Sequence, residues 1–176
     1  MSHQIPAPLS LHRTQVPPAW VDYNGHMSES CYLLAVGDNS DAFFRYLGID
    51  DDYRAAGRSL YTVETHLRHL GEAAEGDQLW CTLQLLDCDH KRVHLFHSLH
   101  RGEDLLATAE QMLLHVDMRA ARTMPLPPAM QEKLAAIKAA HAGLGVPEGA
   151  GASIGIGRAD VVRADRRTAD DRRHRP

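Results

Sequence analysis

The sequence predicts an α+β fold in which a mostly antiparallel sheet wraps around one long central helix. Three observations support this class. The order of hydrophobic patterns is a strand, a long helix, four strands and a terminal helix. The four strands are separated by short turns, which favours antiparallel hairpins. Strands that follow a helix, rather than alternate with helices, favour an antiparallel over a parallel sheet.

The first strand is expected over residues 9–16, where apolar and polar residues alternate weakly. Pro17-Pro18 ends it, because proline cannot donate a ladder hydrogen bond. The long helix is expected from Ser28, a plausible N-cap, to Leu47, with Gly48 at the position where a C-terminal glycine ends a helix. Few charges occur in its first half, so we expect it to be largely buried.

The four later strands are expected over 59–70, 77–88, 91–101 and 104–118. The second and third show the period of two that is typical of a half-buried strand. A second helix is expected over 127–141, with prolines in its first turn, where the N–H groups lack partners in any case.

Composition and charge indicate one globular domain over residues 1–145 and a tail over 146–176. Apolar residues make up 44% and charged residues 24%, which is ordinary for a globular chain. The tail is Gly-rich and then Arg-rich, with few large apolar side chains, so we expect it to be disordered. The net charge of -4 argues against nucleic acid or anionic lipid as a partner.

Three features indicate a cytoplasmic protein that does not span a membrane. No run of 18 apolar residues occurs, and no basic segment followed by an apolar one opens the chain. The three cysteines, Cys31, Cys81 and Cys88, form no C-x-x-C pair, so a disulfide framework is not expected.

The loop between the first strand and the long helix carries the most specific motif. Val21-Asp22-Tyr23-Asn24-Gly25-His26-Met27, followed by Ser-Glu-Ser-Cys-Tyr-Leu, resembles the signature of the 4-hydroxybenzoyl-CoA-type thioesterases. The resemblance covers about residues 9–142 and implies the hotdog fold. More narrowly, the run from Trp20 to Asp50, with Tyr-Thr-Val-Glu-Thr-His over 61–66, resembles the betainyl-CoA thioesterases of bacterial carnitine breakdown. Those occur alone or fused to carnitine dehydrogenase.

The resemblance implies hydrolysis of a short acyl-CoA, with catalytic residues Asp22, Asn24, His26 and Met27. Asp22 matches the catalytic carboxylate, as a nucleophile or as a general base on water. Asn24 would orient the acyl group or the water. The backbone at His26-Met27 would bind the oxyanion beside the helix start, where free N–H groups and a partial positive charge are available. His26 could instead only shape the loop.

The substrate-binding residues expected are Gly25, Trp20, Tyr23, Tyr61 and Glu64. Gly25 lets the backbone approach the thioester. The aromatic rings would hold a trimethylammonium group by cation–π attraction, and Glu64 could balance its charge. Tyr61 could equally be a core residue, and Glu64 could lie on a solvated face.

Several alternatives remain open at this stage. Asp38 and Asp41 on the long helix are other candidate carboxylates, and a non-catalytic acyl-CoA-binding module or a thioesterase for an aromatic acyl group would share the fold. Trp80 could also belong to the aromatic cage, and Arg119 and Arg122 could bind the CoA phosphates. Cys31 is expected to be a small helix residue rather than a nucleophile.

No cofactor and no metal are expected. His94, His97 and His100 are three apart, and residues three apart on a strand point to opposite faces, so they cannot share one ion. The acyl-CoA is the expected partner, together with further copies of the chain, because a small sheet with one helix leaves an edge uncovered. We expect a homodimer or homotetramer.

Overall fold

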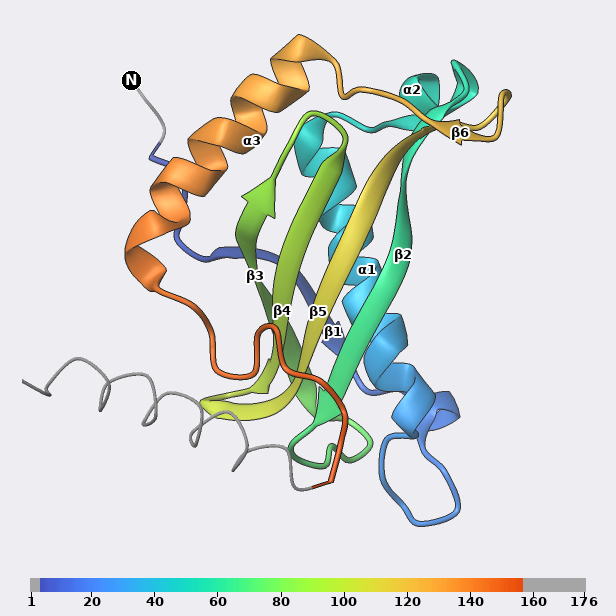
Figure 1. The fold of residues 1–176 in the computed structure, drawn as a ribbon. Coiled ribbons are helices and arrows are strands. Elements are labelled where there is room, and N and C mark those ends of the chain that lie inside the picture. Colours follow the sequence, from blue (N-terminus) through green and yellow to red (C-terminus); the bar gives the residue numbers. More distant parts are fainter. Residues whose placement is uncertain (1–3, 157–176) are drawn as a thin grey trace, which may run out of the picture.

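The computed structural model describes residues 4–156 and shows a curled antiparallel sheet with one long helix on its concave face (Figure 1). The sheet order is β1-β3-β4-β5-β2, with the short β6 paired to β5. The strands are β1 (Leu9–Gln15), β2 (Arg58–His69), β3 (Gln78–Cys88), β4 (Arg92–Arg101), β5 (Asp104–Asp117) and β6 (Arg122–Thr123). The predicted hotdog fold is confirmed.

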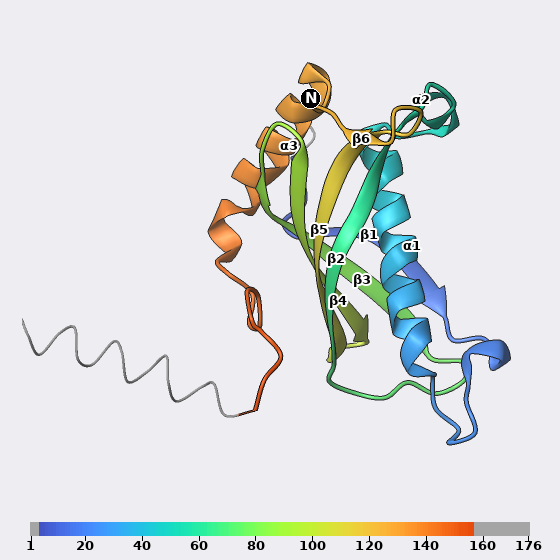
Figure 2. The same cartoon turned by 45° about the vertical axis from the view of Figure 1, so that its right-hand side comes forward.

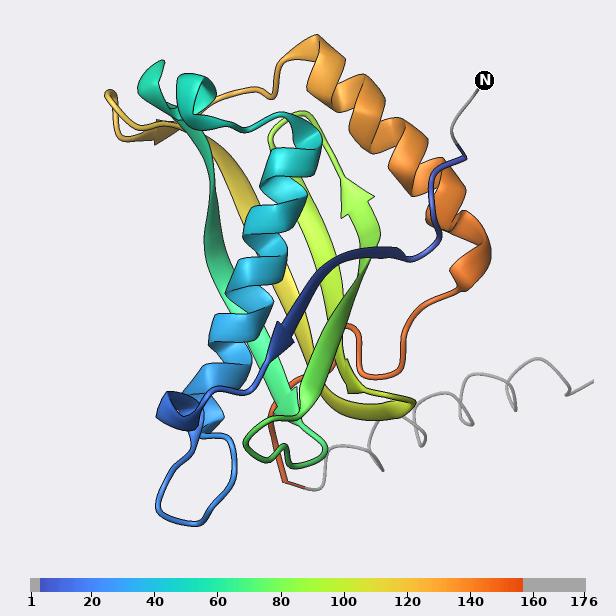
Figure 3. The ribbon, with the colours of Figure 1, turned by 180° about the vertical axis from the view of Figure 1, so that it is seen from behind.

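The central helix α1 (Glu29–Leu47) lies along the concave face of the sheet, as Figure 3 shows from behind. It begins after Ser28 and ends at Gly48, whose φ of 98° is the left-handed conformation that glycine adopts at low cost. Ser28 occupies the N-cap position, but its side chain makes no capping hydrogen bond. The first N–H groups of α1 are therefore not capped by that side chain.

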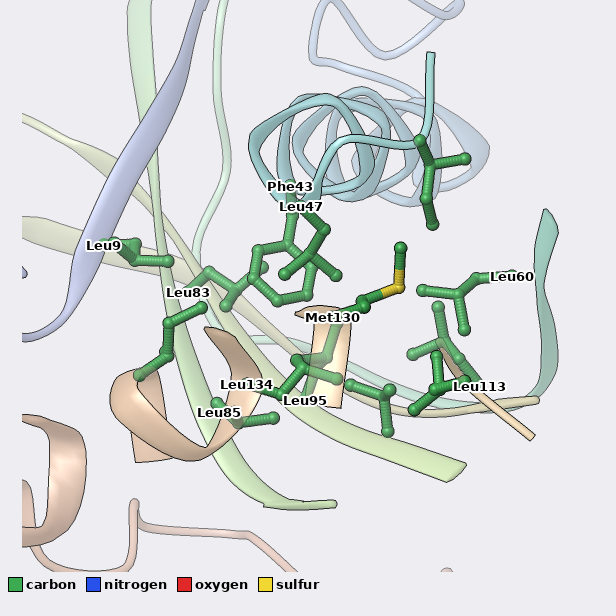
Figure 4. Close-up of a cluster of buried hydrophobic side chains, with 14 residues drawn as sticks. Leu9, Phe43, Leu47, Leu60, Leu83, Leu85, Leu95, Leu113, Met130 and Leu134 are labelled. Carbon is green, nitrogen blue, oxygen red and sulfur yellow. The ribbon is translucent and has the colours of Figure 1, made fainter. Parts of the chain in front are cut away.

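Two apolar clusters hold α1 on the sheet. One surrounds Phe43 and Leu47 and includes side chains of β3, β4, β5 and the second long helix, α3 (Pro128–His141) (Figure 4). The other surrounds Tyr32 and Ala35, near the beginning of α1, and includes Met27 and Ala73. Burial of this apolar surface is the main favourable contribution to folding. The short helix α2 (Asp51–Ala55) lies at the other end of the sheet, where α1 ends.

Polar side chains lie between α1 and the sheet, within an otherwise apolar interior. Asn39 Nδ2 lies 2.9 Å from Nδ1 of His97, and Nε2 of His97 lies 3.1 Å from Oε1 of Gln111. The Ser40 hydroxyl lies 3.0 Å from the same Gln111 oxygen. These four side chains are all buried, so they bind one another in place of water.

The chain after α3 crosses the convex face of the sheet, on the side away from α1 (Figure 2). Gln84 donates to the Gly145 carbonyl at 2.7 Å, and the Gly151 N–H donates to the Glu110 carboxylate at 2.7 Å. These two hydrogen bonds attach Gly145 and Gly151 to the sheet, and the disorder expected for the tail stays a prediction. The Arg-rich remainder of the tail lies outside the described residues.

Candidate active site

The reaction loop, residues 21–28, is a hairpin that projects beyond one end of the sheet, just before α1 (Figures 1 and 3). Val21 and Met27 form an isolated antiparallel bridge that closes the hairpin. The Asp22 N–H donates to the His26 carbonyl at 2.9 Å, and the Gly25 N–H donates to the Asp22 carbonyl at 3.0 Å. Gly25 has φ of +79°, so a side chain at this position would strain the turn.

Asp22 is half-buried, and one of its carboxylate oxygens accepts the Asn24 N–H at 2.8 Å. This is the local turn that Asp and Asn commonly form. It orients the carboxylate, and its second oxygen has no hydrogen-bond donor among the described residues. Asp22 can therefore hold its turn and still present an oxygen to a substrate or a water molecule.

The other expected catalytic residues surround Asp22 in the same hairpin. The side chains of Asn24 and His26 are exposed, and Nε2 of His26 lies 3.5 Å from the Glu72 carboxylate. Met27 is buried, and its N–H donates to the Ala73 carbonyl at 2.7 Å. That N–H is therefore not free to bind an oxyanion in this structure, contrary to the role expected for the Met27 backbone.

The backbone N–H groups of Tyr23, His26, Glu29 and Ser30 have no acceptor among residues 4–156, and those of His26, Glu29 and Ser30 lie next to the start of α1. Glu29 and Ser30 open α1, where the partial positive charge of the helix is concentrated. These donors suit a negative charge that develops on a thioester oxygen.

Within one chain, the aromatic residues expected to form the cage do not all lie close together. Tyr23 lies on the hairpin with 96% of its surface exposed, and Trp20 lies just before it. Tyr61 lies near the beginning of β2, at the opposite end of that strand from the reaction loop. Trp80 stacks on His100 with ring centroids 4.4 Å apart and donates to the Gly102 carbonyl.

Glu64 lies on the convex face of the sheet, opposite Met112 of β5 and away from α1. It lines a hollow of about 310 Å³ with His66, His94 and Glu110, roofed by Gly151 and Ala152. Within one chain Glu64 therefore lies apart from Asp22. This position agrees with the alternative that Glu64 lies on a solvated face of the sheet. The reason is a bulge in β2 between Thr62 and Glu64, which changes the face on which later side chains lie.

The helix carboxylates lie away from the reaction loop as well. Asp38 carries an oxygen 3.9 Å from Nε2 of His12 on β1, and Asp41 is exposed. Arg119 donates to the carbonyl of Ala55, the last residue of α2, at the far end of the sheet. No group of three His, Cys, Asp or Glu side chains within 4–156 is arranged to hold a metal ion.

The sequence pattern did not indicate which segment of the chain contacts the hairpin and holds it in position. This segment is the β2–β3 connection, residues 70–77, which supplies Glu72 to His26 and Ala73 to Met27. Its only sequence signals were the glycines that mark a turn, and these say nothing about which loop it contacts.

Residues 16–134 match the thioesterase-like superfamily. The chain belongs to this superfamily. It is 41% identical, over 84% of its length, to the betainyl-CoA thioesterase of Pseudomonas aeruginosa, of which the match covers 95%. It is also 52% identical over 150 residues to an L-carnitine dehydrogenase/betainyl-CoA thioesterase of Rhizobium meliloti. The chain spans about 30% of the length of that fused relative.

Solved structures of this thioesterase-like fold agree with the sequence comparison. A structure from Pseudomonas putida KT2440 is 35% identical with a TM-score of 0.76, covering 86% of this chain and 98% of that one. A Staphylococcus aureus protein solved in complex with CoA is 25% identical with a TM-score of 0.75, covering 88% and 99%. The family predicted from the loop motif is thus confirmed.

Proposed function

We propose that this protein, an acyl-CoA thioester hydrolase, converts betainyl-CoA and water to glycine betaine and CoA. The choice of betainyl as the acyl group rests on the 41% identity to the Pseudomonas aeruginosa enzyme, which extends over nearly the whole of that enzyme. The reaction class is supported by the superfamily and by the oriented carboxylate of Asp22 beside the start of α1.

In the proposed reaction, the free oxygen of Asp22 attacks the thioester carbonyl or removes a proton from an attacking water. The N–H groups of His26, Glu29 and Ser30 are the candidate donors to the carbonyl oxygen as it becomes negative. The carbon–sulfur bond then breaks, and the CoA sulfur leaves as a thiol once it takes up a proton. In the nucleophilic route this leaves an acyl–Asp22 anhydride, which water hydrolyses to the free acid, a proton and the Asp22 carboxylate. In the general-base route the attacking water supplies the oxygen of the free acid, and the proton that Asp22 removes from it passes to the sulfur. Neither route uses a cofactor.

The surroundings of the hairpin suit an acyl group with a positive charge. Asp22, Glu29 and Glu72 place three carboxylates around it, and Tyr23 presents an exposed ring. A quaternary ammonium is attracted both by carboxylates and by aromatic faces. Trp20 and Tyr23 are therefore the cage residues that a single chain provides.

A hydrolysis panel tests the proposed function. Thiol release would be measured with betainyl-, acetyl-, 4-hydroxybenzoyl- and a medium-chain acyl-CoA under the same conditions. We expect the highest kcat/KM with betainyl-CoA. An equal kcat/KM for acetyl-CoA and betainyl-CoA would contradict the proposed recognition of the cation. No thiol release from any of the four substrates would overturn the proposed enzymatic function.

We further propose that two copies associate through β2, which forms one of the two edges of the sheet, β1 being the other. β2 pairs with β5 on one side only, and Tyr61 and Val63 on it are 49% and 55% exposed. On the adjacent surface of α1, Leu33 and Leu34 are 45% and 49% exposed. An exposed edge strand beside apolar side chains is a natural pairing site for a second copy.

Two-fold pairing of this edge would also complete the proposed cage. If the two-fold axis is perpendicular to the strands, the two copies of β2 run in opposite directions, and the beginning of one β2 meets the end of the other. That end leads into the connection that contacts the reaction loop. In this proposed arrangement Tyr61 of the partner subunit would approach Tyr23, which lies far from Tyr61 within one chain.

Val63→Lys is expected to weaken dimer formation at least about tenfold, because a charge on an edge strand opposes strand pairing. Sedimentation velocity over a dilution series measures the association. Val146→Lys is the matched control, since Val146 is 82% exposed but lies on the convex side, away from the edge. Unchanged association in Val63→Lys would mean that β2 is not the interface.

The three cysteines are free in the structure, and no helix within 4–156 is long and apolar enough to cross a membrane. Free thiols are typical of a reducing compartment. We propose that the reaction takes place in the cytoplasm, a location with which free thiols agree.

A further inference from the structure

The β2–β3 connection and the reaction loop are more than 40 residues apart in sequence and are joined through backbone atoms. The Met27 N–H donates to the Ala73 carbonyl at 2.7 Å, and both side chains are buried, with exposed fractions of 4% and 1%. The position of Ala73 therefore sets the position of Met27. Since the Val21–Met27 bridge closes the hairpin, it also sets the position of Asp22.

The hydroxyl of Tyr32 contacts the backbone at Ala73 and at Gly71. Tyr32, in the first turn of α1, accepts the Ala73 N–H at 3.2 Å and donates to the Gly71 carbonyl at 3.0 Å. These two groups flank Glu72, so the hydroxyl fixes the backbone on both sides of that residue. Burial raises the pKa of Tyr32, which keeps its hydroxyl protonated and able to donate.

The surroundings of Tyr32 allow it little movement. Its side chain is buried, and its ring meets that of His69 edge to face, with centroids 4.9 Å apart. From the other side, Arg101 donates to the Glu72 carbonyl at 3.1 Å and to the Asp77 carboxylate at 3.0 Å. The connection is therefore held at both Gly71 and Ala73 by α1 and at Glu72 by the end of β4.

We propose that Tyr32 is a positioning residue for thioester hydrolysis, an inference that rests on the proposed function. Its hydroxyl ties the start of α1 to Gly71 and Ala73, and Ala73 ties the reaction loop to the same place. The carboxylate on the loop and the oxyanion donors at the helix start thereby keep a fixed separation. A displacement of about 1 Å in such a pair can lower a rate about 100-fold.

Tyr32→Phe removes only the hydroxyl, and Tyr53→Phe is its matched control. Tyr53 is half-buried, and Tyr53→Phe also removes a hydrogen bond, that of 2.7 Å with His115, but Tyr53 lies in α2 at the far end of the sheet. With betainyl-CoA we expect Tyr32→Phe to lower kcat about 10- to 100-fold and to change KM by less than about threefold. Tyr53→Phe should leave both within about twofold.

Amide hydrogen exchange at Met27, measured without substrate, gives a second readout. Tyr32→Phe should speed this exchange at least about tenfold, because Ala73 loses the contact that holds it, whereas Tyr53→Phe should not. Unchanged exchange at Met27, or faster exchange with unchanged kcat, would overturn the proposal, as would equal kcat losses in the two variants. If the wild type released no thiol, the proposed function would fail, and with it the catalytic role of Tyr32. The exchange result would still show whether the hydroxyl holds the loop.

Discussion

Asp22→Asn is expected to lower kcat about 10²- to 10⁴-fold, the range that a general acid–base group contributes. The asparagine side-chain oxygen can still accept the Asn24 N–H, so the hairpin should keep its shape. Only the negative charge and the basicity are lost. Steady-state thiol release with betainyl-CoA measures kcat, and circular dichroism confirms that the variant is folded.

Asp38→Asn is the control for this prediction, because it makes the same change on α1, where the carboxylate faces His12 rather than the reaction loop. It should keep kcat within about twofold. Full activity in Asp22→Asn together with loss in Asp38→Asn would move the chemistry to the helix. Loss in both variants would mean that charge near the site matters more than one carboxylate.

A rapid-quench experiment on the wild type distinguishes the two roles of Asp22. If Asp22 is a nucleophile, label from the acyl group should appear on the protein before free acid is formed. If Asp22 is a base, thiol and free acid should appear together, and no label should be retained.

The regular elements were predictable because their signals are local. The period of two and the turns placed each of β2 to β5 within one residue of its observed bounds, and Gly48 marked the end of α1. The motif likewise placed the catalytic candidates on one hairpin, since residues 22–27 are adjacent in sequence. Such features depend on neighbours a few residues away, which a sequence displays directly.

What could not be predicted depends on contacts between distant segments. The bulge at Val63 put Tyr61 and Glu64 on the same face, although an unbroken strand would put residues three apart on opposite faces. The contacts of Tyr32 with Gly71 and Ala73 join segments about 40 residues apart. No local pattern marks either feature, because both arise only when the sheet closes around α1.

The buried polar layer between α1 and the sheet, formed by Asn39, Ser40, His97 and Gln111, is expected to make the protein less stable in acid. His97 is fully buried between Asn39 and Gln111, and burial lowers its pKa from 6.5 to about 4. The folded state therefore keeps His97 neutral, whereas the unfolded chain takes up a proton as the pH falls below about 6.5. The free energy of unfolding is therefore not reduced by protonation of His97 above pH 6.5, and it falls as the pH decreases from 6.5 to about 4.

The size of this effect follows from the pKa difference. At about 1.4 kcal/mol for each pH unit, His97 alone should remove roughly 3 kcal/mol of the free energy of unfolding across that window. Burial also lowers the pKa values of His100, His115 and His141, which act in the same direction. Urea unfolding at one protein concentration and several pH values between 7 and 4.5 measures the slope.

His97→Gln separates the contribution of His97 from that of the other histidines. A glutamine amide can accept from Asn39 and donate to Gln111, so it can fill both hydrogen-bonding roles without titrating. The free energy of unfolding of the variant should therefore fall less steeply with decreasing pH than that of the wild type. Near pH 5.5 the two slopes should differ by about 1.4 kcal/mol per pH unit, which corresponds to one proton. Parallel curves for the two proteins would show that His97 takes up its proton equally in both states. In that case the polar layer would be open to water or able to rearrange around a charged ring, and α1 would be less rigidly seated on the sheet than the hydrogen bonds at Asn39 and Gln111 indicate.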